Sequence, residues 1–250
     1  MARYQVILAY DGAQFYGFQR QASGREGRTV QGVVEDALRR LDGQAHSLLG
    51  SGRTDTGVHA SGQVIAFDLE WRHGPDALRS ALNAHLPADV AAQEVREADP
   101  AFHPRYDARY RRYRYRIFCH PVRDPLREHF AWRIWPPVAV ERMRLAAAAL
   151  PGTHDFAAFG TPPRAAGSTV RTVRQADWLE NEAGELIFEI SANAFLYHMA
   201  RRLVGFQVEI GRGRLPSTAV GQLLQAPPTT VVQALAPAHG LELVEVVYEE

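Results

Sequence analysis

The fold of this chain is indicated first by the stretch Arg-Tyr-Gln-Val-Ile-Leu-Ala-Tyr at residues 3–10. Larger apolar side chains recur there at every second position, from Tyr4 to Tyr10, which is the period of a β-strand with one buried face. A helical pattern comes next. Thr29 is placed to cap a helix with apolar side chains on one face, and Gly43 is placed to end it.

The rest of the first half continues this alternation of strands and helices. A short strand is expected at 46–50 and a longer one at 62–69. A helix is expected to start at Pro75, because proline suits a first helical turn, and a further strand at 89–96. The order β-α-β-β-α-β is the split βαβ arrangement, which builds a mostly antiparallel sheet with helices on one face.

The second half is expected to be a decorated copy of the first. A polar turn near residues 98–108 separates them, so we expect an N-terminal half at 1–103 and a C-terminal half at 104–250. The expected elements of the second half are strands at 109–119, 169–179, 185–192 and 241–248, helices at 139–150, 196–210 and after Pro216, and a loop at 160–168.

Composition excludes several classes of chemistry. The 250 residues include 28 basic and 28 acidic side chains, and all of the basic ones are Arg. Without Lys there is no side-chain Schiff base and no P-loop lysine. Cys119 is the only cysteine, which rules out an intrachain disulfide and argues against thiolate metal sites. No apolar run reaches the ~18 residues of a membrane span, so we expect a cytoplasmic protein with no membrane contact.

Asp55 is the sharpest candidate for catalysis. It lies in the loop Ser51-Gly-Arg-Thr-Asp-Thr-Gly-Val-His59, between two expected strands, with Arg53 two residues before it. A carboxylate beside a guanidinium stays ionised and can act as a nucleophile or a general base. The alternative is an ordinary turn in which Asp and Thr side chains bond the local backbone.

A strand rich in arginine and tyrosine is the second candidate. Residues 105–116 contain six Arg and one acid, Asp107. Strand alternation places Tyr113 with Tyr115 and Ile117 on one face and the even-numbered arginines on the other. Such a strand offers rings for base stacking and cations for phosphates. The alternative is an edge strand whose arginines are solvated and block aggregation.

Two further segments carry weaker indications. The loop at 11–21 is rich in aromatic and amide side chains, which suit RNA contact or a plain surface loop. On the expected helix at 196–210, positions 198, 201, 205 and 209 share one stripe. Arg201 there can pair with a partly buried carboxylate, or simply belong to a solvated helix face. The histidines lack metal-site spacing, and no dinucleotide or Walker motif occurs, so we expect no metal and no nucleotide cofactor.

Taken together, these segments resemble the TruA family of tRNA pseudouridine synthases. The most specific block is Gly52-Arg-Thr-Asp-Thr-Gly-Val-His-Ala60, found together with Arg111-Arg-Tyr-Arg-Tyr115. The other matching pieces are Tyr10-Asp-Gly12, Tyr16-Gly-Phe-Gln-Arg-Gln21, Thr29-Val-Gln31, Gly62-Gln-Val64, Asn83, Phe102-His103, Phe195-Leu-Tyr-His-Met-Ala-Arg201 and Val204-Gly205. Thr56 stands where the family usually has Ala or Ser, and Phe18 where Trp is common.

The resemblance implies an α+β fold of two ferredoxin-like halves joined into an extended mixed, mostly antiparallel sheet with helices on one face. It implies an isomerase that converts uridine to pseudouridine at positions 38, 39 and 40 of the tRNA anticodon stem-loop, as a homodimer and without a cofactor. Asp55 is then the catalytic carboxylate, Tyr113 the ring that stacks on the target base, and Arg53 and Arg201 the residues that hold Asp55 and the cleft in place.

Two other functions compete with this interpretation. Asp55-Thr56-Gly57 matches the tripeptide of aspartic proteases, but those enzymes need two such carboxylates, and the tripeptide occurs once here. An RNA-binding module without catalysis is the second, because split βαβ folds often bind RNA on the open face of the sheet.

Overall fold

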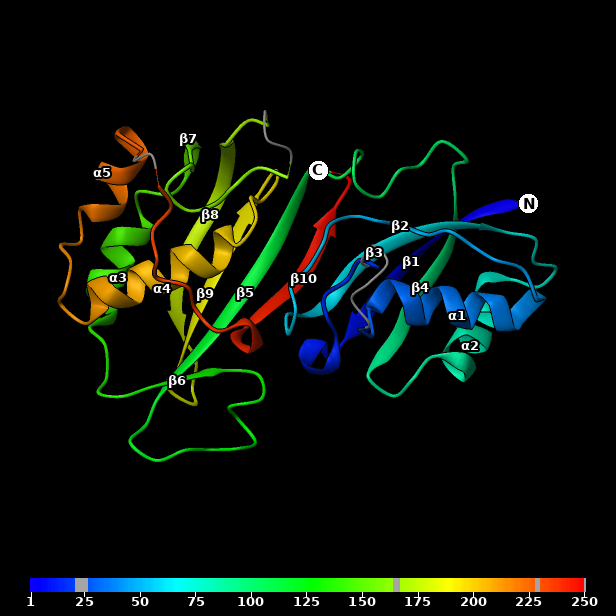
Figure 1. The fold of residues 1–250 in the computed structure, drawn as a ribbon, viewed down its shortest axis with the longest axis horizontal. Helices are drawn as coiled ribbons and strands as arrows, with labels where there is room; N and C mark the ends of the chain where they lie inside the picture. Colours follow the sequence, from blue (N-terminus) through cyan, green and yellow to red (C-terminus); the bar gives the residue numbers. More distant parts are fainter. Residues whose placement is uncertain (21–26, 164–166, 228–229, 250) are drawn as a thin grey trace. The chain divides into compact units, whose positions relative to one another are not determined.

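The computed structural model describes residues 1–20, 27–163, 167–227 and 230–249. The chain forms two compact units (Figure 1). The first comprises Met1–Arg109 together with Leu243–Glu250, and the second comprises Tyr110–Glu242. Gln21 and residues 164–166 of the loop expected at 160–168 lie outside the described residues.

The sheet of the first unit is built around β1 (Ala2–Tyr10). This strand is antiparallel to β3 (His59–Leu69) on one side and to β4 (Val90–Ala98) on the other. In strand order β10 (Leu241–Val247) follows β3. The short β2 (Leu49–Gly50) also pairs with β3, in antiparallel orientation. The last strand of the chain therefore extends the sheet that the first strand begins.

The apolar pattern of β1 has the predicted consequence. Tyr4, Val6, Leu8 and Tyr10 are all buried. Arg3 lies between apolar positions and pairs with a carboxylate on the neighbouring strand β3, donating to both oxygens at 2.8 Å. One face of this strand therefore carries the core, as its two-residue period predicts.

The helices of the first unit are fixed at their ends by the residues that the sequence singled out. In α1 (Val30–Asp42), the Thr29 hydroxyl accepts a hydrogen bond from the Gly32 amide, and Gly43 ends the helix with φ of 76°. In α2 (Pro75–His85), proline occupies the first turn. The two helices pack against each other (Figure 1). A short 3-10 helix, η1 (Gly12–Gln14), lies in what the sequence suggested was an open loop.

The second unit contains an antiparallel run of four strands in the order β5-β9-β8-β7. The sequence predicts three of these, β5 (Tyr110–Cys119), β8 (Val170–Glu180) and β9 (Glu185–Ala192). It did not predict β7 (Gly152–Asp155). Nor did it predict β6 (Trp132–Ile134), which is parallel to β5 and makes the sheet mixed.

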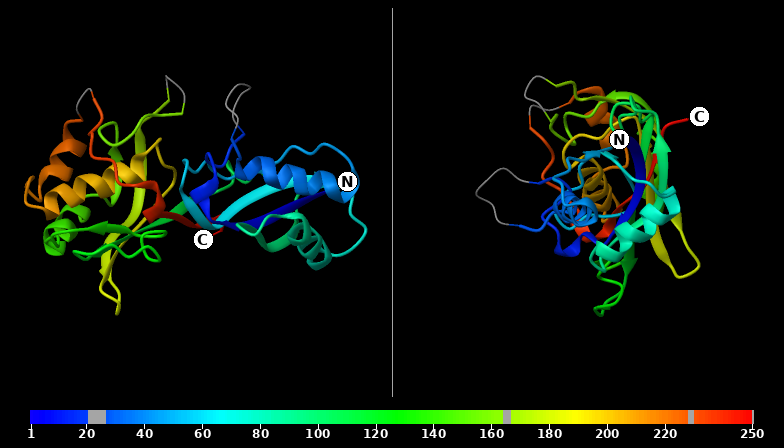
Figure 2. Two further views of the ribbon diagram at one scale, coloured as in Figure 1. Left: turned by 60° about the horizontal axis from the view of Figure 1, so that its bottom comes forward. Right: turned by 90° about the vertical axis from the view of Figure 1, so that its right-hand side faces the viewer.

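The helices of the second unit are α3 (Val140–Ala147), α4 (Met199–Gly211) and α5 (Ala219–Gln225). Helix α3 contacts both of the others and β8, and Figure 2 shows all three on one side of β8 and β9. One expectation was wrong: His198 is not helical but caps α4 in the left-handed conformation, with φ of 64°. The stripe expected on this helix therefore begins at Arg201.

The fold-class prediction is confirmed: this is an α+β protein with a mixed, mostly antiparallel sheet. A short 3-10 helix, η2 (Ala238–Gly240), precedes the last strand. Among the described residues, no helix is both long and apolar enough to cross a membrane.

Candidate functional site

The loop that carries Asp55 links two strands of one hairpin. It runs from the end of β2 at Gly50 to the start of β3 at His59, and the Ser51 amide donates to the Val64 carbonyl at 2.8 Å. Within the loop Asp55 is half-buried and Arg53 is exposed. The hairpin therefore holds a carboxylate at the end of two paired strands, with a cation two residues away.

The backbone on both sides of the Asp55 side chain is fixed by hydrogen bonds. The Thr54 carbonyl accepts from the Phe18 amide at 3.1 Å, and the Asp55 carbonyl accepts from the Val58 amide at 3.1 Å. The Gly57 amide donates to the Phe15 carbonyl at 3.4 Å. The segment after η1 thus clamps the loop from outside, and Phe15 and Phe18, both buried, anchor that segment in the core.

Two glycines make this close approach of backbone to backbone possible. A Cβ added to Gly12 would lie 2.0 Å from the Val58 carbonyl oxygen. Gly17 has φ of 87°, and a Cβ there would lie 2.9 Å from the Thr54 carbonyl oxygen. Glycine is required at Gly17 by conformation and at Gly12 by space.

Beneath the loop lies a set of buried polar side chains. The Tyr10 hydroxyl is 2.8 Å from the Thr54 hydroxyl, and the Gln63 amide nitrogen is 3.5 Å from the Tyr10 hydroxyl. Gln63 also donates to the Gly52 carbonyl at 3.2 Å and accepts from the Ser51 hydroxyl at 2.6 Å. All four of these side chains are buried. Burial raises the pKa of Tyr10 to about 12, against the opposing effect of its hydrogen bonds.

A histidine ties the two ends of the clamp together. His59, buried at the start of β3, has its Nδ1 3.1 Å from the Gly12 amide and 3.0 Å from an Asp11 carboxylate oxygen. The Asp11 carboxylate also accepts from the Ala13 amide at 3.0 Å, which caps η1. These contacts hold η1 against the end of the loop that follows Asp55.

In the second unit, Tyr113 lies in the middle of β5. The strand alternates as predicted, with Tyr113, Tyr115 and Ile117 buried and the arginines between them half-buried. Tyr113 pairs with Ile190 on β9, and its ring packs edge-on against Phe195, with 4.8 Å between ring centres. The ring is therefore held by strand register and by a second aromatic side chain.

Arg201 lies in the first turn of α4 and is bound to the segment that leads into η2. Its Nε donates to the Ala236 carbonyl at 2.8 Å, and the Ala236 amide donates back to the Arg201 carbonyl at 3.1 Å. Tyr115 donates to the next carbonyl, that of Pro237, at 2.8 Å. Burial holds the pKa of Tyr115 well above its usual value, and the positive charge of Arg201 opposes that effect.

Three arginines of β5 make hydrogen bonds or ion pairs within the second unit. Arg114 forms an ion pair with Glu189 at 2.6 Å, and Arg116 with Glu242 at 2.9 Å. Arg111, which is buried, donates to the Asn193 carbonyl at 2.8 Å. The arginines of β5 are thus not simply solvated, and those that pair with carboxylates are not all free to bind RNA phosphates.

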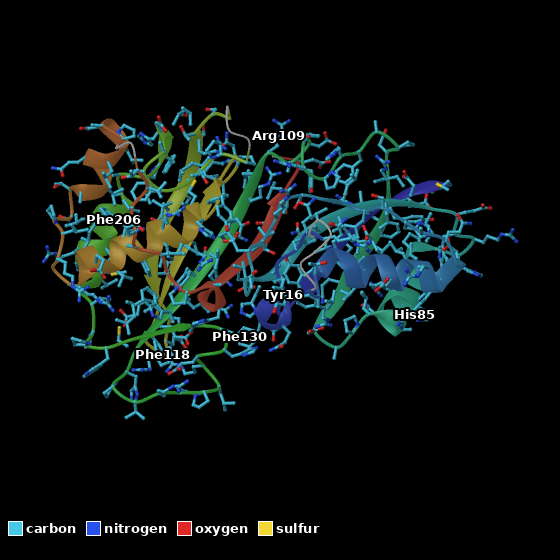
Figure 3. All side chains as sticks on the ribbon, viewed as in Figure 1. Tyr16, His85, Arg109, Phe118, Phe130 and Phe206 are labelled. Atoms are coloured by element: carbon cyan, nitrogen blue, oxygen red, sulfur yellow. The ribbon has the colours of Figure 1, made fainter. Side chains whose placement is uncertain are left out.

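An exposed aromatic ring belongs to the clamp of the first unit. Tyr16 follows η1 and has 57% of its surface exposed, and Figure 3 labels it close to η1. Its amide donates to the Arg28 carbonyl at 2.9 Å. The aromatic loop, for which the sequence left RNA contact and a plain surface loop open, thus presents one ring to solvent and buries the other two, Phe15 and Phe18.

Sequence reasoning overlooked the part played by Gln63. The signal was available: Gln63 is the amide side chain in a strand whose next four residues, from Val64 to Phe67, are apolar. A polar residue in a buried stretch of strand needs partners, and here the partners are the Asp55 loop and Tyr10. No group of three or more metal-ligating side chains occurs in the described parts of the chain.

Comparison with known proteins identifies one family model that matches most of the chain. A model of the family described as tRNA pseudouridine synthase matches residues 6–107 and 146–249. The "tRNA pseudouridine synthase A" of Limosilactobacillus fermentum is 41% identical, with 100% of this chain and 97% of the relative covered. The protein of the same name from Moorella thermoacetica is 44% identical over 98% of both chains.

A solved structure, that of a Cbf5-Nop10-Gar1 complex, has 12% identity and a TM-score of 0.38. It covers 93% of this chain and 49% of that one.

Proposed function

Because the chain belongs to the tRNA pseudouridine synthase family, we propose that it modifies uridines 38, 39 and 40 of the tRNA anticodon stem-loop with Asp55 as its catalytic carboxylate. The broader activity follows from the family: the protein is an isomerase that converts uridine in tRNA to pseudouridine. The observation that best supports Asp55 is its place, a half-buried carboxylate on a loop whose flanking carbonyls are both hydrogen-bonded.

The reaction needs one well-placed carboxylate more than anything else. The bond between N1 of uracil and C1′ of ribose breaks, the base turns, and a bond forms between C5 and C1′. The proton on C5 is lost and N1 gains one, so no oxidant and no external group is consumed. In this proposal Asp55 supplies a nucleophile or general base for these steps, and a loop held by hydrogen bonds favours catalysis because it limits the movement of the carboxylate.

Tyr113 is proposed to stack on the target base. A base that leaves its stack costs a few kcal/mol, and stacking on an aromatic ring returns about 1–3 kcal/mol per base. Tyr113 suits this role because strand pairing and Phe195 already fix its ring, so little freedom is lost on binding.

Arg201 and Arg53 complete the proposed site. From the family resemblance we propose that Arg201 supports the RNA-binding cleft, and in the second unit its guanidinium is fixed through Nε by the Ala236 carbonyl. Arg53 is exposed beside Asp55 and suits contact with the RNA backbone as well as support of the carboxylate. With cations contributing to tRNA binding, affinity is expected to fall as salt rises.

We further propose that the protein acts as a homodimer in the cytoplasm. The dimer rests on the family resemblance, and the cytoplasmic location rests on the sequence, in which no apolar run reaches the ~18 residues of a membrane span. Light scattering on the purified protein tests the first: a mass of twice 27.8 kDa supports a dimer, and a mass of 27.8 kDa contradicts it.

The target positions are tested by mapping pseudouridine in unmodified tRNA after incubation with the purified protein. Transcripts with a single uridine at 38, 39 or 40 are compared with a transcript that has cytidine at all three. We expect pseudouridine in the first three and none in the fourth. Modification of the fourth at the same rate contradicts the proposed positions while leaving the family activity intact.

The stacking role of Tyr113 is tested by two substitutions. Tyr113→Phe keeps the ring, and Tyr113→Ala removes it. Because stacking needs only the ring, Ala should lower turnover or tRNA affinity by roughly 5- to 100-fold more than Phe does. Equal losses in the two variants argue instead for a role of the hydroxyl.

A further inference from the structure

We propose that the buried side chains of Gln63, Tyr10 and Thr54 form a hydrogen-bonded chain whose function is to position Asp55 for catalysis. The inference rests on the proposed catalytic role of Asp55 and goes beyond it, because it assigns positioning residues that never touch the substrate. We call this set the Gln63–Tyr10–Thr54 chain.

The order of donors and acceptors in this chain is set by Gln63. Its amide oxygen accepts from Ser51 at 2.6 Å, and its amide nitrogen donates to the Gly52 carbonyl at 3.2 Å. The second proton of that nitrogen points to the Tyr10 hydroxyl at 3.5 Å, a long and weak bond. Tyr10 is then left with its own proton to donate to Thr54, 2.8 Å away.

Burial keeps this order in place. Gln63 is 0% exposed, and the other members of the chain are also buried. Water does not compete for these donors and acceptors, and each would be costly to leave unpaired. Since burial raises the pKa of Tyr10 to about 12, its hydroxyl keeps its proton across the pH range in which RNA enzymes work.

The chain acts on the residue next to Asp55 from the inside, while the backbone clamp acts from the outside. The Thr54 side chain is bonded to Tyr10, and the Thr54 carbonyl is bonded to the Phe18 amide at 3.1 Å. Gln63 holds the other end of the same loop through Ser51 and Gly52. A loop fixed at these points presents Asp55 in one place. A shift of about 1 Å at such a group can cost ~100-fold in rate.

The first test separates the Thr54 hydroxyl from the bulk of the side chain. Thr54→Val removes the hydroxyl and keeps the shape, whereas Thr54→Ser keeps the hydroxyl. We expect the single-turnover rate to fall about 10- to 100-fold in the first and to stay within about 3-fold of wild type in the second. The dissociation constant for tRNA should change less than about 2-fold in both, because neither variant removes a proposed RNA contact.

The second test asks whether Tyr10 and Thr54 act through the bond between them. Tyr10→Phe removes only the hydroxyl and should lower the rate to a similar degree. If both hydroxyls act through one bond, the double variant Tyr10→Phe, Thr54→Val is no slower than the slower single variant. If the two rate losses instead multiply in the double variant, the hydroxyls act independently, and the proposal that they act through one hydrogen bond fails.

The third test controls for general loss of stability. Gln63→Leu in the first unit is compared with Gln207→Leu in the second. Both glutamines are 0% exposed. Gln207 also bridges two partners, accepting from Trp178 at 2.9 Å and donating to the Leu203 carbonyl at 3.0 Å. Both variants should melt at lower temperature, but per folded molecule only Gln63→Leu should lose rate.

The outcomes distinguish this inference from the proposed function. Asp55→Asn is measured alongside. Suppose Asp55→Asn is inactive while Thr54→Val and Gln63→Leu keep the wild-type rate per folded molecule. The Gln63–Tyr10–Thr54 chain then contributes only to stability, and the inference fails. If Asp55→Asn is itself active, the proposed catalytic assignment fails and the inference fails with it. Equal losses in Gln63→Leu and Gln207→Leu also overturn the inference.

Discussion

The two units hold their candidate site residues by different means. In the first, Asp55 lies on a loop, and buried hydroxyl and amide groups together with backbone bonds from the segment after η1 fix it. In the second, Tyr113 lies in a regular strand and is fixed by strand register and ring packing, and Arg201 lies in a regular helix and donates to one backbone carbonyl. A loop has no repeating bonds of its own, so it needs dedicated side chains. A strand or helix is held by its regular backbone hydrogen bonds and needs fewer such side chains.

This difference predicts where the molecule tolerates change. The first unit should be sensitive to the loss of single atoms around the loop, because specific hydrogen bonds hold each of the buried polar side chains there. The second should be sensitive mainly to changes that move a whole segment against α4 or β5.

The largest effect is expected for Gly12→Ala. A Cβ there would lie 2.0 Å from the Val58 carbonyl oxygen, an overlap with backbone that no rotamer relieves. We expect the free energy of unfolding to fall by more than about 3 kcal/mol, with loss of activity. Gly52→Ala is the matched control in the same loop, because nothing lies within 4 Å of its added Cβ. Denaturant unfolding of both variants gives the two free energies of unfolding. Equal values contradict the close backbone contact between Gly12 and the Asp55 loop.

Alkaline pH should weaken the first unit through Tyr10. Its pKa is raised by burial to about 12 in the folded chain and is near 10 in the unfolded one. The stability it contributes is therefore fully present below about pH 10 and is lost as the pH rises to about 12. The size is roughly 3 kcal/mol. Urea unfolding between pH 9 and 11.5 should show a smaller decline in Tyr10→Phe than in wild type; identical slopes in the two count against the buried hydroxyl.

In the second unit, Gly205→Ala should displace the segment that binds Arg201. The added Cβ would lie 2.8 Å from the Ala234 carbonyl oxygen, so the backbone near Ala236 must move away from α4. We expect a loss of about 1–3 kcal/mol in stability. Gly221→Ala in α5 meets only a methyl group at 3.6 Å and should be neutral or stabilising by up to ~1 kcal/mol. Melting temperatures decide, and a Gly205→Ala variant as stable as Gly221→Ala contradicts the account.

The smallest effect is expected for the ion pairs of β5. Arg114 is already paired with Glu189, so the double variant Arg114→Gln, Glu189→Gln should change the salt dependence of tRNA binding very little. Arg53→Gln, at an exposed position beside Asp55, should lower the slope of log affinity against log salt by about 1. Filter binding at several salt concentrations gives both slopes. If the slope changes strongly in the double variant and not in Arg53→Gln, then Arg114 rather than Arg53 contacts the RNA backbone.

Local patterns predicted much of this structure because local physics decides them. Helix α1 begins after Thr29 and ends at Gly43, as expected. The alternation in β1 and β5 correctly predicted that Tyr10 and Tyr113 lie on buried faces. What the sequence did not reveal depends on contacts between distant residues. The role of Gln63 appears only when Tyr10, more than fifty positions away, is brought beside it.

Short elements escaped prediction for a related reason. Strands β6 and β7 have three and four residues, too few to show a period, and their partners in the sheet stabilise them. His198 was expected within a helix at 196–210, but its backbone takes the left-handed conformation and the helix begins at the next residue, Met199. Periodicity defines the faces of long elements better than it defines where they start.

The most direct measurement is the single-turnover rate of pseudouridine formation by Asp55→Asn, with tRNA affinity determined on the same preparation. Asp76→Asn, in the exposed first turn of α2, is the control. We predict that Asp55→Asn binds tRNA within about 3-fold of wild type and forms pseudouridine at least ~1,000-fold more slowly, while Asp76→Asn behaves as wild type. An Asp55→Asn variant that binds tRNA and retains more than about a hundredth of the wild-type rate contradicts the catalytic role of this carboxylate.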